Sequence, residues 1–174
     1  KYIIDEVSLN RFLTKLVQIP SINPPGNEGP VATVISDKLE SLGFKVEIVE
    51  AAPGRPNVIG RLPGKGKGPT LLLNGHMDVQ PPGNHWTHDP FAATLKDGML
   101  YGQGAMDMKA GLAAIIYALD GLKRANQELA GDIIVTAVAD EVCGGHLGTG
   151  FLVSEGLVSA DMAVVCEPTG DTVR

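Results

Sequence analysis

The sequence contains little of what marks several large classes of protein. It has two cysteines, Cys143 and Cys166, among 174 residues, too few for a disulfide framework. No apolar run approaches the roughly 20 residues that a helix needs to span a bilayer, and residues 1–10 contain no signal-peptide-like hydrophobic region. We therefore expect a cytoplasmic protein with reduced thiols that does not act in a membrane.

Basic residues are also scarce. The chain has 14 Lys and Arg against 20 Asp and Glu, a net charge of −6, and no basic cluster that could bind phosphates. The glycine- and lysine-rich stretch at residues 64–68 lacks the GxxxxGK[ST] spacing of a phosphate loop. These observations argue against nucleic acid as a partner and against a nucleotide-binding α/β domain. The 44% hydrophobic content suits one domain with a sizeable core.

Hydrophobic periodicity predicts alternating helices and strands. Helical patterns cover residues 8–19, 29–42, 106–125 and 147–155, and strand-like runs cover residues 44–49, 57–62, 70–73, 132–139 and 161–166. A hairpin is predicted over residues 94–101, around Asp97 and Gly98. Strands that alternate with helices predict an α/β fold, a three-layer sandwich with a mostly parallel mixed sheet.

Polar residues with metal-binding chemistry follow several of these strands. They are His76 and Asp78 after residues 70–73, Asp107 after the hairpin, Asp140 and Glu141 after residues 132–139, and Glu167 after residues 161–166. Ligands bind at the carboxyl ends of strands in open α/β sheets, so these side chains are expected at one edge. A mixed histidine and carboxylate site suits zinc with open positions for water and substrate.

Each of these residues also has an ordinary structural interpretation. A single histidine such as His76 is more often a hydrogen-bonded structural residue than a ligand, and Asp78 is a plausible turn former. Asp107 is a favourable helix cap, at the start of the predicted helix. The functional interpretation rests on the combination, because a carboxylate two positions after His76 can orient its imidazole ring.

The chain resembles the zinc amidohydrolases of peptidase family M20, which include acetylornithine deacetylase, succinyl-diaminopimelate desuccinylase, aminoacylase and related dipeptidases. The resemblance spans nearly the whole chain and includes several motifs in the family's order. These are Ser21-Ile22-Asn23-Pro24-Pro25-Gly26, Gly75-His76-Met77-Asp78, Trp86 with Asp89-Pro90-Phe91, Leu100-Tyr101-Gly102-Gln103-Gly104-Ala105-Met106-Asp107-Met108-Lys109, and Cys166-Glu167-Pro168-Thr169.

The resemblance implies a role for each matching residue. His76 and Glu167 would bind the first zinc, Asp107 would bridge two zincs, Asp78 would orient His76, and Glu141 would be the general base. It also implies a zinc-exopeptidase-like fold and hydrolysis of an amide bond in an N-acyl amino acid or dipeptide-like substrate. One or two Zn²⁺ ions are expected, with Co²⁺ or Mn²⁺ as alternatives. The full-length protein is expected to bind a small amino-acid-derived substrate, and a homodimer is compatible with the resemblance.

The sequence departs from the family pattern after the strand at residues 132–139. The family usually has a further acidic residue where this chain has Val142, and valine cannot coordinate a second zinc. A one-residue shift would make Asp140 the base and Glu141 the ligand, and Cys143 is a further candidate for the missing ligand. The alternative function is therefore a non-catalytic or truncated family member with an incomplete second metal site.

The extent of the sequence leads to a further expectation. The chain begins with Lys1 rather than Met and ends at Arg174 without a closing signal. Residues 1–174 correspond to the N-terminal part of the family's catalytic domain. The lid or dimerisation domain and the C-terminal catalytic segment, with a final zinc-binding histidine, are expected to be absent. Such a partial sheet should leave an apolar edge exposed.

Overall fold

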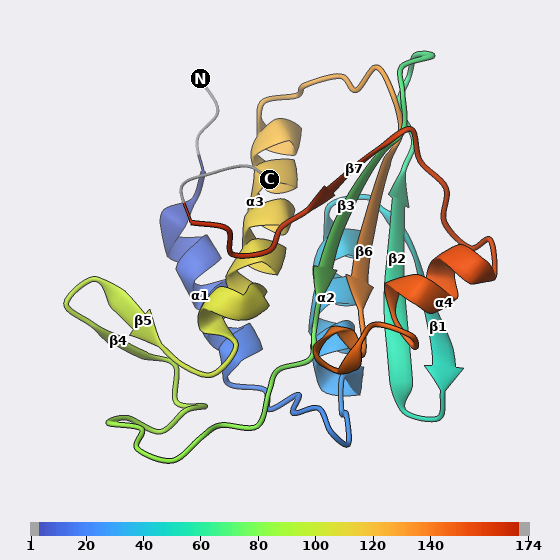
Figure 1. Cartoon of the computed structure of the whole chain (residues 1–174). Coiled ribbons are helices and arrows are strands. Elements are labelled where there is room, and N and C mark those ends of the chain that lie inside the picture. Colours follow the sequence, from blue (N-terminus) through green and yellow to red (C-terminus); the bar gives the residue numbers. More distant parts are fainter. Residues whose placement is uncertain (1–3, 171–174) are drawn as a thin grey trace.

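The computed structural model describes residues 4–170, and within them a five-stranded mixed sheet lies between helices (Figure 1). Its strands are, in spatial order, β1 (Lys45–Ala52), β2 (Arg55–Leu62), β6 (Ile133–Val138), β3 (Leu71–His76) and β7 (Met162–Val165). Strand β3 is parallel to β6 and β7, whereas β2 is antiparallel to β1 and β6. The predicted α/β class with a mixed sheet is confirmed.

Helices cover both faces of this sheet. On one side lie α1 (Glu6–Val17), α2 (Gly29–Ser41) and α3 (Ala110–Arg124), and on the other lies the short helix α4 (Thr149–Ser154). Strand β6 contributes to both cores, because Val135 packs in the larger one and Ile134 packs with Leu152 of α4 in the smaller one. The result is the predicted three-layer arrangement. None of the helices in residues 4–170 has the length and hydrophobicity that crossing a bilayer requires.

The predicted hairpin is present as β4 (Thr94–Lys96) and β5 (Met99–Tyr101), which pair antiparallel. The two residues between the strands, Asp97 and Gly98, have φ angles of 53° and 76°. Positive φ at both central positions gives a turn whose twist matches that of the flanking strands. A local pair of residues is sufficient to predict this element.

The long helix predicted over residues 106–125 begins later than expected. Residues Ala105–Lys109 form a single π-type turn (η1), and Asp107 has non-helical angles of φ −116° and ψ 97° before α3 begins at Ala110. Met108 is buried beneath β3, where Gly75 allows the close approach. A Cβ atom at Gly75 would lie 2.7 Å from the Met108 Cε atom. Packing against the sheet therefore takes precedence over helical periodicity here.

Strand β7 forms one border of the sheet in the described residues, with β3 as its neighbour. Its apolar residues Met162, Val164 and Val165 are 51%, 47% and 55% exposed. The expected exposed apolar edge is therefore present in the structure. Such an edge offers unpaired backbone groups and apolar side chains for further pairing.

Candidate metal centre

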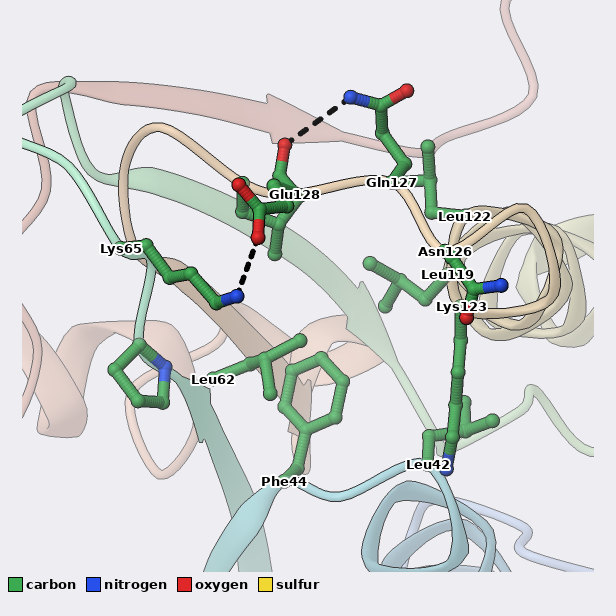
Figure 2. A pocket seen from close by; sticks show the side chains of 12 residues that line it. Leu42, Phe44, Leu62, Lys65, Leu119, Leu122, Lys123, Asn126, Gln127 and Glu128 are labelled. Carbon is green, nitrogen blue, oxygen red and sulfur yellow. Dashed lines mark hydrogen bonds and ion pairs between the residues drawn. The ribbon is translucent and has the colours of Figure 1, made fainter.

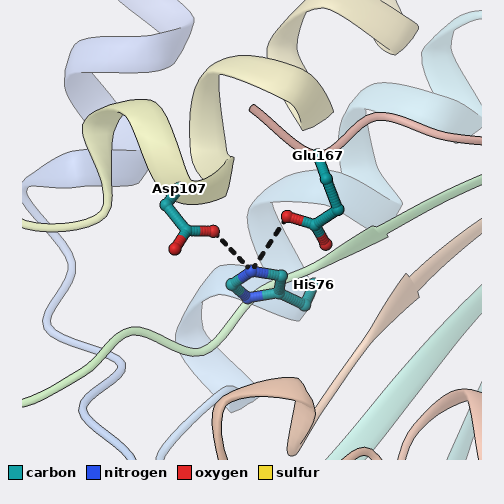
Figure 3. Close-up of side chains that lie close together, drawn as sticks. All are labelled: His76, Asp107 and Glu167. Carbon is teal, nitrogen blue, oxygen red and sulfur yellow. Dashed lines mark hydrogen bonds and ion pairs between the residues drawn. The ribbon is translucent and has the colours of Figure 1, made fainter. Parts of the chain in front are cut away.

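Three potential ligand atoms meet beyond the carboxyl end of β3 (Figure 3). His76 is the last residue of β3, Asp107 lies in η1, and Glu167 follows β7 by two residues. The His76 Nε2 atom is 3.0 Å from Asp107 Oδ1 and 3.9 Å from Glu167 Oε2. One ligand atom from each side chain lies within 4.8 Å of the other two. The three residues expected from the sequence to be metal ligands are thus brought together.

The donor set fits a divalent cation. Ligand bonds of about 2.0–2.1 Å in tetrahedral geometry place neighbouring ligand atoms roughly 3.3 Å apart. The two measured separations, 3.0 Å and 3.9 Å, bracket that value. An imidazole nitrogen and two carboxylate oxygens also match the chemistry of zinc. The side chain of Asp107 is 57% exposed and that of Glu167 33% exposed, so the group is open to water and substrate.

Asp78 orients the imidazole ring of His76. The His76 Nδ1 atom is 2.8 Å from the backbone oxygen of Asp78 and 3.4 Å from its carboxylate Oδ1. When Nδ1 donates its proton to these oxygens, the lone pair of Nε2 points toward Asp107 and Glu167. This is the tautomer that metal coordination through Nε2 requires. Asp78 therefore contacts a candidate ligand but does not belong to the candidate ligand group.

The fully buried carboxylate of Asp78 also holds the loop that follows β6. It accepts hydrogen bonds from the Asn23 amide at 2.8 Å and from the backbone N–H groups of Glu141 and Val142, both at 3.2 Å. Burial acts to raise the pKa of Asp78, but the hydrogen bonds from His76 and Asn23 outweigh it and lower that pKa. One ionised carboxylate thus connects the end of β3 with the loop bearing Glu141.

Glu141 and Asp140 face different surroundings, although they are adjacent in sequence. The Glu141 Oε2 atom lies 3.5 Å from His76 Nε2, and its side chain is 51% exposed. Asp140 is buried, and its carboxylate accepts hydrogen bonds from Arg55 and from the backbone N–H of Leu147. The register in which Asp140 would act as the base is not favoured by this geometry, because its buried carboxylate is already bound by Arg55 and Leu147.

The two residues after Glu141 add no ligand to the group. Val142 contributes its backbone N–H to Asp78, as described above, and its side chain cannot bind a metal. Cys143 is exposed, and among the described residues it is not part of the three-residue ligand group. Val142 and Cys143 therefore do not extend the three-residue ligand group of the described residues.

The electrostatics of the centre reflect its concentration of carboxylates. Burial acts to lower the pKa of His76, but hydrogen bonds with Asp78 and Asp107 and the negative charges of Asp78 and Glu141 raise it to about 9. Burial, together with the charges of Glu141 and Asp107, raises the pKa of Glu167 despite the opposing effect of His76. Because a metal binds the neutral imidazole, a proton and a cation would compete for His76.

The polar residues that support the site do not follow from local sequence patterns. Asn23 lies in the Ser21–Gly26 motif, so a signal for it existed, although its contact with Asp78 did not follow from the motif. The buried Glu28 and the partly buried Arg55 form an ion pair although they are 27 residues apart. No local pattern connects them.

A separate apolar cavity of about 420 Å³ lies at the other end of the sheet (Figure 2). Phe44, Leu62 and Leu119 are among its lining residues, and Lys65 pairs with Glu128 at its border. Leu62 is paired with Ile133 at the start of β6, whereas His76 is paired with Val138 at its end. This cavity is therefore remote from the ligand group and is not part of the candidate metal centre.

The candidate ligand group lies beyond the carboxyl ends of the parallel strands β3 and β7, which is where open α/β sheets bind their ligands. The sequence pattern of peptidase family M20/M25/M40 matches residues 72–174. The chain belongs to this family. The predicted family membership is confirmed.

Curated relatives match most of this chain. It is 36% identical over 148 residues to the N-formyl-4-amino-5-aminomethyl-2-methylpyrimidine deformylase of Bacillus subtilis, a match that covers 83% of this chain and 34% of that protein. It is 37% identical over 172 residues to the succinyl-diaminopimelate desuccinylase of Gluconacetobacter diazotrophicus, covering 91% and 43%. The chain thus spans well under half the length of these two relatives, which are both enzymes.

Solved structures support the same fold. An M20 family metallo-carboxypeptidase from Sulfolobus solfataricus matches with a TM-score of 0.75 at 28% identity, covering 92% of this chain and 36% of that one. Human carnosine dipeptidase 1 matches with a TM-score of 0.73 at 25% identity, covering 92% and 37%. The zinc-exopeptidase-like fold expected from the sequence is therefore confirmed.

Proposed function

We propose that the protein is a metal-dependent hydrolase that cleaves the amide bond of an N-acyl amino acid or a dipeptide-like substrate. His76, Asp107 and Glu167 would hold a divalent cation, Asp78 would orient His76, and Glu141 would be the general base. The observation that carries the proposal is the convergence of the three ligand atoms within 4.8 Å, with Glu141 3.5 Å from His76. The relatives named above, which act on amide or peptide bonds according to their names, support it.

The chemistry follows from the placement of Glu141. Its half-exposed carboxylate would take a proton from a water molecule as the water oxygen bonds to the carbonyl carbon. The same proton then passes to the leaving nitrogen as the C–N bond breaks, which yields a carboxylic acid and an amine. A bound divalent cation would polarise the carbonyl and lower the pKa of the water. Asp78 would keep the imidazole of His76 in its ligand orientation throughout.

Further parts of the proposal concern the whole protein. Zn²⁺ is the preferred cation, with Co²⁺ or Mn²⁺ able to use the same nitrogen and oxygen ligands. We infer a cytoplasmic enzyme with a small amino-acid-derived substrate, in which residues 1–174 form the N-terminal part of the catalytic domain. A lid or dimerisation domain and a C-terminal catalytic segment would complete it, and would allow a homodimer.

The test uses the complete protein encoded by the gene, loaded with Zn²⁺. Release of amine is measured with N-acetyl, N-succinyl and N-formyl amino acids and with dipeptides. Glu141→Gln should retain zinc but lower kcat by at least about 100-fold, since general-base catalysis contributes on that scale. Glu155→Gln changes an exposed glutamate at the C-terminal end of α4 and should leave kcat unchanged. Full activity of Glu141→Gln would refute the role of Glu141, and absence of both bound metal and turnover would refute the function.

Val142 supports a second candidate, a family member that binds substrate or metal without catalysis. Its side chain stands where the family pattern has an acidic residue and offers no ligand. Val142→Glu in the complete protein separates the two functions. Activity that arises only after this change would favour the non-catalytic protein, whereas substantial activity of the parent protein would exclude it.

A further inference from the structure

A network of charged side chains, built around the partly buried Arg55, connects with the residues of the metal centre. Glu28, fully buried, immediately precedes α2, and Arg55 is the first residue of β2. The Arg55 Nε and Nη2 atoms donate to the two carboxylate oxygens of Glu28 at 2.9 Å and 2.8 Å. The same Nη2 atom lies 3.4 Å from Asp140 Oδ1. One guanidinium is thus shared by two carboxylates from segments far apart in the chain.

Asp140 in turn organises the loop that carries Glu141. Its backbone oxygen accepts hydrogen bonds from the N–H groups of Cys143 at 3.2 Å and Gly145 at 2.7 Å, and its carboxylate accepts one from Leu147 at 3.1 Å. It adopts a φ of 69°, a conformation that non-glycine residues rarely adopt without such support. The position of Glu141 in the loop after β6 therefore depends on the contacts that hold Asp140.

The network also reaches His76 through Asn23. The Asn23 amide nitrogen donates to Asp78 at 2.8 Å and is 3.3 Å from Asp140 Oδ1. Asp78 contacts His76 Nδ1, as shown above. The buried amide therefore links the Arg55–Asp140 pair to the carboxylate that orients the candidate metal ligand.

Arg55 is the cation facing three buried carboxylates, those of Glu28, Asp140 and Asp78. The hydrogen bond to Glu28 and the charges of Glu28, Asp140 and Asp78 all raise the pKa of Arg55, so it stays charged. A guanidinium can bind one carboxylate with two parallel hydrogen bonds and still reach a second, whereas a lysine ammonium lacks this fork. The residue type therefore matches the geometry.

We propose that Arg55 is a positioning residue for the metal centre, because it holds Asp140, and through Asp140 and Asn23 it fixes both Glu141 and the Asp78–His76 pair. This inference rests on the proposed function for its effect on turnover. Its effect on metal affinity does not depend on that function.

The test removes the Glu28–Arg55 pair without changing the net charge of the network. In Glu28→Gln with Arg55→Met, one negative and one positive charge are lost together, so no charge of this pair is left buried alone. The zinc dissociation constant of the complete protein should increase about tenfold or more, as expected when support behind a ligand is lost. The value of kcat should fall by a similar factor, with KM changed less than about threefold.

Two further variants make the result interpretable. Asp120→Asn with Arg124→Met removes another arginine–carboxylate pair, linked at 2.6 Å near the end of α3, and should change neither quantity. Arg55→Lys keeps the charge but not the fork, so it should fold even if the double variant does not, and should shift both quantities in the same direction. The inference would be overturned if both Arg55 variants kept a zinc affinity and a kcat per folded molecule within twofold of the parent values. If the parent protein hydrolyses no amide, the proposed function fails and zinc affinity alone decides the role of Arg55.

Discussion

The buried ammonium group of Lys109 donates a hydrogen bond of 2.9 Å to the carbonyl oxygen of Leu16, near the end of α1. A second hydrogen bond of 2.8 Å goes to the carbonyl oxygen of Ile19. Lys109 follows Asp107 by two residues, so this contact attaches the segment that carries a candidate ligand to α1. Burial lowers the pKa of Lys109 to about 8, because the charged form loses its hydration.

The lowered pKa of Lys109 predicts a specific pH dependence of stability. The unfolded chain keeps this proton up to its ordinary pKa of 10.5, whereas the folded protein releases it near pH 8. The unfolded state therefore binds more protons between these values, and stability should rise across that window by roughly 3 kcal/mol from this group. Urea unfolding at pH 7.5 and 10.5, roughly the ends of that window, measures the difference in the free energy of unfolding between the parent and Lys109→Met. The exposed Lys15→Met is the control, and a parent-minus-variant difference that is independent of pH would contradict the prediction.

His76 predicts the opposite trend in metal-free protein. Its pKa is raised to about 9, so the stabilisation from its protonated form is fully present below about pH 6.5 and is lost as the pH rises through 9. The difference in the free energy of unfolding between the parent and His76→Gln should therefore fall by roughly 3 kcal/mol as the pH rises from about 6.5 to about 9. The experiment is a urea titration with a chelator present, and the exposed His85→Gln should follow the parent. If the difference in the free energy of unfolding between the parent and His76→Gln stayed constant or grew with pH, the close contact of carboxylates with His76 would be contradicted.

Zinc affinity tests the ligand assignment without a substrate. Replacement of His76, Asp107 or Glu167 by alanine should each weaken Zn²⁺ binding by more than about 100-fold, because each removes a direct ligand. Asp78→Asn should weaken it by about 10- to 100-fold, since it removes no proposed ligand but disturbs the orientation of His76. Competition with a chromophoric chelator gives the dissociation constants, and Glu155→Ala serves as control. Unchanged affinity in any of the three alanine variants would remove that residue from the ligand group.

Gly104, which opens η1, should not tolerate a side chain. Its φ is 73°, and an added Cβ atom would lie 2.1 Å from Val79 Cγ1, whereas Gly54 has a φ of 74° with no atom within 4 Å. Gly54→Ala should therefore cost only the backbone strain, about 1 kcal/mol. Gly104→Ala should cost about 1–3 kcal/mol more because of the clash.

Urea unfolding compares the two glycine variants directly, and zinc affinity should fall only in Gly104→Ala. The backbone N–H of Lys109 donates to the carbonyl of Gly104, so a displaced Gly104 shifts the turn that holds Asp107. Equal destabilisation by the two substitutions would show that the contact with Val79 relaxes without cost.

Features that depend on local sequence could be predicted well. Asp97 and Gly98 predict their turn because both residues adopt positive φ readily, and the strand-end rule placed His76 and Glu167 at one edge without knowledge of the contacts. The start of β2 was predicted two residues late. Arg55 pairs with Ala52 across a tight turn, and this pairing extends the strand beyond its apolar run.

Features that depend on contacts distant in sequence could not be predicted. Asp107 was placed at the start of a regular helix, but the burial of Met108 against Gly75 forces a non-helical turn there. The exposed position of Glu141 and the buried position of Asp140 differ because Arg55, 85 residues before Asp140, binds only one of them. Hydrophobic periodicity carries no information about such a choice.

Asp78 contacts the imidazole of His76 and the backbone of the loop with Glu141, so a single carboxylate serves two functional groups. Substitutions of Asp78 and Glu141 should therefore show strong epistasis, since the first already disturbs what the second removes. The same coupling constrains the evolutionary history of the chain. Under the proposed function, a lineage that drifts at position 78 would impair cation binding and proton transfer together.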